Sequence, residues 1–153
     1  MSKVWWMTLA LVLAVSARAG ELELSDAWVR ALPPVQKMTA AYLTVTNTGA
    51  TEVELISGSS PIASTIEIHT SRMVDGYMRM EQLPGLKLAP GESTTLEPGG
   101  THLMLLSLNR MPTAGDVVKL CLTSAEQEQF CTEATTRKSS NESGDTDDHA
   151  HHH

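Results

Sequence analysis

The sequence is poor in cysteine, with two cysteines among 153 residues. Nine residues separate Cys121 from Cys131, so the Cys-x-x-Cys spacing typical of thiol–disulfide oxidoreductases is absent. Neither cysteine has a neighbouring histidine. This disfavours a blue-copper electron-transfer centre, which needs a thiolate beside two histidines and usually a weak axial methionine.

Positive charge is also scarce, since 11 Lys and Arg stand against 18 Asp and Glu and give a formal net charge of −7. An acidic protein is repelled by nucleic acid and by anionic membrane surfaces. We therefore expect neither as a partner. The same balance suits a protein that handles a cation, although an acidic surface also serves solubility.

Long apolar runs are limited to one, from Val4 to Val15. Lys3 precedes this run, and Ala17-Arg18-Ala19 follows it with the small-x-small pattern of a signal-peptidase site. The run is shorter than the roughly 20 residues that span a bilayer, which disfavours the alternative of an uncleaved anchor. We predict a signal peptide over residues 1–19, cleavage after Ala19, a periplasmic location and no membrane insertion afterwards. Cleavage removes two positive charges and takes the net charge from −7 to −9.

The two cysteines survive this cleavage. In an oxidising compartment such a pair forms a disulfide. Nine intervening residues can make a hairpin that sets two strands side by side. We predict a bond between Cys121 and Cys131.

The region from residue 20 to residue 138 has the pattern of an all-β domain. Short alternations of apolar and polar residues are separated by turn residues, and no stretch has helical periodicity. We expect an antiparallel β-sandwich. The predicted strands cover 22–29, 41–46, 53–57, 65–69, 77–81, 102–108, 117–123 and 129–135, with a loop at 57–61, a hairpin turn at 75–76 and short strands between the turns at 84–85, 90–91 and 98–100.

The candidate site residues are His69, Met80, His102 and Met104. Residues 69–104 contain four of the eight methionines and the two histidines that lie outside the extreme C-terminus. Imidazole and thioether are soft, uncharged donors, and thioethers select copper(I) over zinc, magnesium or calcium. Period two places His102 and Met104 on one face of a strand, with Leu103 and Leu105 on the other. His69 is expected at the C-terminal end of its strand, facing away from Ile68.

Single methionines are more often core residues than ligands, so the concentration of these donors carries the copper(I) hypothesis. Met73 and Met78 lie on the same hairpin as Met80 and are auxiliary candidates. With both histidines assigned to a metal, no Ser/His/Asp set remains, and we expect no enzymatic activity.

The C-terminal residues differ in composition from the rest. Residues 139–148 contain four acids and no apolar residue, which predicts disorder. They lead to a histidine-rich end that is a candidate for binding copper(II), the alternative being a fragment of a purification tag. Its histidines are His149, His151, His152 and His153.

These residues resemble the signature of the periplasmic copper chaperones called PCu(A)C. His69, ten residues, Met80, twenty-one residues, His102, one residue and Met104 match its spacing. The surroundings are similar too, and the resemblance covers about residues 26–124. The similar segments are Ala40-Ala41-Tyr42-Leu43, Asn47, Ser60-Pro61, Met73-x-Asp75-Gly76-x-Met78-x-Met80 and Pro98-Gly99-Gly100-x-His102-Leu103-Met104-Leu105.

The resemblance implies a cupredoxin-like sandwich of immunoglobulin-like Greek-key type and ligand roles for the four candidates. It also implies delivery of copper to the dinuclear copper centre of cytochrome c oxidase, with oxidase subunit II or another copper chaperone as acceptor. We expect a monomer. The alternative is a copper scavenger or buffer for uptake or resistance, in which the histidine tail captures copper(II).

Overall fold

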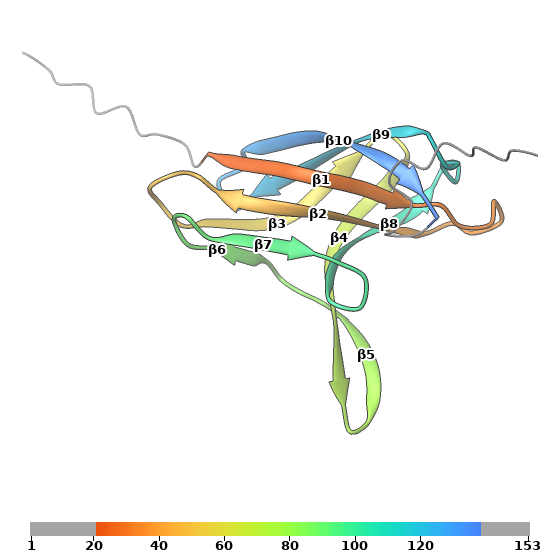
Figure 1. Cartoon of the computed structure of the whole chain (residues 1–153), viewed down its shortest axis with the longest axis horizontal. Helices are drawn as coiled ribbons and strands as arrows, with labels where there is room; N and C mark the ends of the chain where they lie inside the picture. Colours follow the sequence, from red (N-terminus) through yellow and green to blue (C-terminus); the bar gives the residue numbers. More distant parts are fainter. Residues whose placement is uncertain (1–20, 139–153) are drawn as a thin grey trace, which may run out of the picture.

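The computed structural model describes residues 21–138, and this part of the chain forms ten strands without a helix (Figure 1). Residues 21–138 therefore contain no helix that could cross a membrane. The predicted signal peptide and histidine tail lie outside the described residues. The strands are β1 Leu22–Arg30, β2 Thr39–Asn47, β3 Val53–Ser60, β4 Ala63–Val74, β5 Tyr77–Gln82, β6 Leu86–Leu88, β7 Ser93–Leu96, β8 Thr101–Leu108, β9 Val117–Ser124 and β10 Gln129–Arg137.

The strands form a sheet that closes on itself. Its order is β5-β4-β8-β2-β1-β10-β9-β3-β6. The sheet closes because β3 also pairs with β4, each of which lies next to one end of this path. The short β7 pairs with β2.

The all-β prediction is confirmed. The prediction of a wholly antiparallel sheet is wrong at one place, because β1 and β10 run parallel and pair Trp28 with Thr135. Side chains alternate with period two in parallel and in antiparallel strands alike, so the sequence pattern could not reveal the parallel pair.

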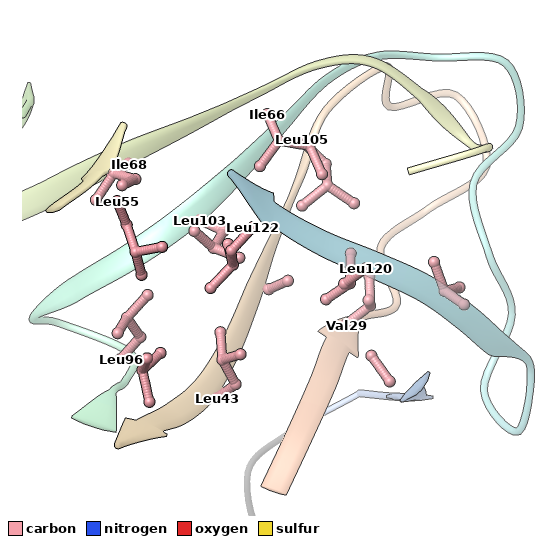
Figure 2. Packing of buried hydrophobic residues seen from close by; sticks show 14 of the residues in the cluster. Val29, Leu43, Leu55, Ile66, Ile68, Leu96, Leu103, Leu105, Leu120 and Leu122 are labelled. Atoms are coloured by element: carbon pink, nitrogen blue, oxygen red, sulfur yellow. The ribbon is translucent and has the colours of Figure 1, made fainter. Parts of the chain in front are cut away.

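The core lies inside the closed sheet and is built from alternate residues of the strands (Figure 2). On β4 and β8 the buried partners are Ile66 opposite Leu105 and Ile68 opposite Leu103. Burying each such side chain contributes about 1.5–3 kcal/mol. A shift of one residue would turn these four side chains to the outer face, so the core fixes the register of the two strands.

Two predicted boundaries are wrong. His69 was expected at the end of a strand, but β4 continues to Val74 and forms a long hairpin with β5. Both faces of this hairpin carry exposed residues, so apolar alternation fades after His69 although the backbone stays extended. The expected loop at 57–61 is strand as far as Ser60. The strand β3 packs closely on β9 at Gly58. A Cβ atom at this position would come 2.8 Å from the Cys121 carbonyl oxygen, so glycine is favoured here.

Cys121 lies opposite Cys131 in the β9–β10 pair, and the two are joined by a disulfide. This confirms the predicted bond. The bond joins two residues that are 10 positions apart in the sequence. Neither strand contributes a candidate copper ligand.

Replacing both Cys121 and Cys131 by Ala is expected to lower the free energy of unfolding by about 2–3 kcal/mol, because the cross-link restricts the unfolded chain. Urea unfolding of wild type and variant measures the difference. Wild-type protein treated with reductant is the matched control and should unfold like the variant. Equal midpoints for the oxidised protein and the variant would contradict this prediction.

Candidate metal centre

The two histidines of the domain form a direct cross-strand pair. His69 of β4 lies opposite His102 of β8, and the ring centroids are 6.2 Å apart. Both side chains lie on the face opposite to Ile68 and Leu103, which are buried in the core. The core pairs therefore place the two imidazoles next to each other.

The two thioethers lie on the same face as the histidines. Met104 follows His102 by two residues on β8, and Met80 of β5 lies opposite Ser71, two residues after His69 on β4. Three neighbouring strands thus present all four predicted donors from one side. Met104 is half-buried, whereas Met80 is 55% exposed.

A cavity of about 430 Å³ opens on this face. It is lined by Met80, His102 and Met104, together with residues of the β1–β2 connection and the Pro98-Gly99 turn. His69 is not a lining residue and lies beside the cavity through its pairing with His102. The cavity therefore brings three of the four donors around one hollow.

His102 is held in place by the turn that precedes β8. Its side chain is buried at 4% exposure, and its Nδ1 lies 2.9 Å from the carbonyl oxygen of Gly100. A carbonyl only accepts hydrogen bonds, so Nδ1–H donates and Nε2 keeps its lone pair. Gly99 has a φ of 84°, a left-handed conformation that favours glycine and shapes this turn. His102 can therefore offer Nε2 to a metal.

Aromatic residues support the buried histidine. Tyr42 lies 6.3 Å from His102 between ring centroids and stacks on Trp28 at 4.4 Å. The guanidinium of Arg137 lies over the Trp28 ring. Burial raises the pKa of the Tyr42 hydroxyl, and the charge of Arg30 opposes that rise. Trp28 is buried, and its ring packs against Tyr42 and Arg137.

His69 has a different partner. Its Nε2 lies 2.8 Å from Oε2 of Glu67, which precedes it by two residues on the same face of β4. Its Nδ1 is buried and has no hydrogen-bond partner. The sequence interpretation missed Glu67, although its place two residues before a candidate ligand on a strand was a usable signal.

Met38 is the other residue that the sequence interpretation missed. It lies on the β1–β2 connection and lines the cavity with Met80, His102 and Met104. Met38 is far from Met80, His102 and Met104 in the sequence, and no local residue pattern indicates that it shares a cavity with them.

The auxiliary methionines lie farther along the hairpin. Met73 and Met78 pair directly across β4 and β5 on the same face as Met80, and they are 64% and 56% exposed. Neither lines the cavity. The hairpin projects away from the body of the domain (Figure 1).

Hard-metal ligands do not cluster in this part of the chain. Among residues 21–138, no three side chains of His, Cys, Asp or Glu come together in a way that could hold a metal ion. Structural zinc sites use four such ligands and catalytic zinc sites three. The four candidate donors on this face are the imidazoles of His69 and His102 and the thioethers of Met80 and Met104.

The fold is similar to that of solved PCuAC domains. The copper-bound PCuAC domain from PmoF2 aligns with a TM-score of 0.63 at 19% identity and covers 78% of this chain and 95% of that one. The copper(I) form of DR1885 from Deinococcus radiodurans aligns with a TM-score of 0.55 at 30% identity, over 75% of this chain and 76% of that one. These matches confirm the sandwich-like all-β fold.

A curated relative, "Putative lipoprotein Lxx21020" from Leifsonia xyli subsp. xyli (strain CTCB07), is 31% identical over 106 residues. The match spans 69% of this chain and 63% of that protein's length. The family model described as "Putative lipoprotein LpqE-like" matches residues 22–136. With most of its length matched, the chain belongs to the LpqE-like family, and its fold is that of PCuAC domains.

Proposed function

We propose that this protein is an exported copper(I) chaperone that binds one copper(I) ion through His69, Met80, His102 and Met104. One observation carries the proposal: the direct His69–His102 pair has two thioethers on the same face. Solved neighbours include a copper-bound PCuAC domain and a copper(I) form of DR1885. Their similarity in fold supports the same cargo here.

The donors suit copper(I) chemically. Thioethers favour the reduced ion and, unlike thiolates, are not consumed by disulfide formation. The unpartnered Nδ1 of His69 supplies a lone pair that no protein group uses. Neutral ligands leave the charge of the ion uncompensated, which limits affinity and suits transfer better than storage.

The acceptor we propose is the dinuclear copper centre of cytochrome c oxidase, reached through its subunit II or another chaperone. The ion would move by stepwise ligand exchange. Met80, Met78 and Met73 form a row of thioethers from the site to the exposed end of the hairpin, which gives exchange a route. A monomer in the periplasm with a Greek-key sandwich fits this role, and the relative named as a lipoprotein is consistent with export.

Anaerobic titration against a chromogenic copper(I) competitor should show one tight equivalent. The paired changes His102→Ala and Met104→Leu are expected to weaken copper(I) binding by more than about 100-fold. Losing a residue that only hydrogen-bonds to a metal ligand typically costs up to that factor, and this variant loses two ligands. Leu conserves the volume of Met, so Met104→Leu alone separates loss of sulfur from loss of packing. Unchanged affinity in the double variant would contradict the proposed site.

Met73→Leu combined with Met78→Leu should leave the copper(I) affinity unchanged and slow the release of copper to a chelator. The reason is that these thioethers lie outside the cavity, along the route out. Stopped-flow absorbance of the copper–chelator complex measures the rate. The matched control is Met80→Leu, which should weaken affinity. Wild-type release rates in the double variant would show that the row plays no part in transfer.

The alternative role as a scavenger is separated from delivery by removing the tail. A chain ending at Lys138 should keep the copper(I) equivalent and the release rate, and it should lose any copper(II) that the full chain binds. Copper(II) titration followed by electron paramagnetic resonance measures the second quantity. Loss of copper(I) transfer on truncation would favour capture by the tail over delivery by the domain.

A further inference from the structure

We infer that Glu67 is a positioning residue that holds His69 in one tautomer, so that His69 offers Nδ1, and not Nε2, to copper(I). This inference rests on the proposed function, because it assigns a role toward the same ion. Its basis is the 2.8 Å contact between Glu67 Oε2 and His69 Nε2, together with the buried, unpartnered Nδ1.

The tautomer follows from hydrogen-bond chemistry. An ionised carboxylate only accepts hydrogen bonds, so the ring nitrogen beside it must carry the proton. In the neutral ring the lone pair then lies on Nδ1. The opposite tautomer would bury an N–H donor without a partner and would set two acceptors against each other at Nε2, and both arrangements cost free energy. The structure therefore favours Nε2–H.

The two histidines are prepared in opposite ways. The Gly100 carbonyl binds Nδ1 of His102 and leaves Nε2 free, whereas Glu67 binds Nε2 of His69 and leaves Nδ1 free. Outer partners of this kind fix ring orientation and raise the basicity of the ligand nitrogen. A carboxylate also brings a negative charge close to an otherwise neutral set of ligands. Glu67 would thus strengthen the binding of a cation without contacting it.

The fold holds Glu67 in place for this role. In the β4–β8 register Glu67 lies opposite Met104 and His69 lies opposite His102, so the carboxylate occupies the same block of paired residues as three ligands. The side chains of His69 and Glu67 are 17% and 26% exposed. Within residues 21–138, His69 is the one group to which Glu67 makes a hydrogen bond or ion pair. The carboxylate therefore has no competing structural partner there.

The test begins with copper-free protein. Two-dimensional ¹H–¹⁵N spectra of the imidazole rings, recorded at a pH where the rings are neutral, report which nitrogen of His69 carries the proton. Wild type should show a protonated Nε2 and an unprotonated Nδ1. Glu67→Ala should shift the population toward protonated Nδ1. Glu67→Gln keeps an oxygen acceptor and should retain the wild-type tautomer.

Copper(I) titration of the same proteins gives the second readout. Glu67→Ala should weaken affinity by about 10–100-fold, and Glu67→Gln should lose less. The matched control is Glu81→Gln, which removes a carboxylate from the same hairpin, where Glu81 pairs with Arg72. This control should change neither the His69 spectrum nor the affinity.

Several results would overturn the inference. They are a protonated Nδ1 in the wild type, a His69 spectrum unaffected by Glu67→Ala, or wild-type copper affinity in that variant. All three leave the proposed function standing. A wild-type chain that binds no copper(I) would instead overturn the proposed function. The tautomer of His69 would then have no role in binding copper(I).

Discussion

The pairing register of β4 with β8 is the constraint on which the proposed metal centre depends. Ile66 and Ile68 face Leu105 and Leu103 in the core, and these contacts hold the two strands in one alignment. The same alignment pairs the outward-facing residues, so that His69 lies opposite His102 and Glu67 lies opposite Met104. A one-residue shift would bury charge and expose leucine, so the free energy of the core also maintains the position of the site.

The proposed donors and the neighbouring methionines form a gradient from buried to exposed. His102 is almost fully buried, Met104 is half-buried, and Met80, Met78 and Met73 are each more than half exposed. In the proposed site, a buried His102 with a fixed tautomer would define the geometry, and the exposed thioethers would exchange with an acceptor. The arrangement therefore combines a buried part on the closed sheet with an exposed part on the hairpin. This division suits a protein that must hold an ion and release it.

The sequence was sufficient for the presence and order of most strands and for the shared face of His102 and Met104, because both follow from period-two alternation over a buried core. It was not sufficient for the ends of β3 and β4. It was also sufficient for the hairpin at Asp75-Gly76 and for the disulfide. It was insufficient where structure depends on contacts distant in sequence. The cavity position of Met38 and the parallel pairing of β1 with β10 belong to that class. The spacing of Glu67 and His69 places both on one face of a strand, but the role proposed for Glu67 also depends on the orientation of the His69 ring, which the spacing does not determine.

The central claim is that thioether sulfur and imidazole nitrogen together bind the ion. Copper K-edge X-ray absorption of the copper(I)-loaded protein tests it most directly, because sulfur and nitrogen scatterers are distinguishable. The wild type should show both in the first shell, and the paired variant Met80→Leu, Met104→Leu should lose the sulfur contribution and keep the nitrogen. A first shell of nitrogen and oxygen alone in the wild type would contradict this account.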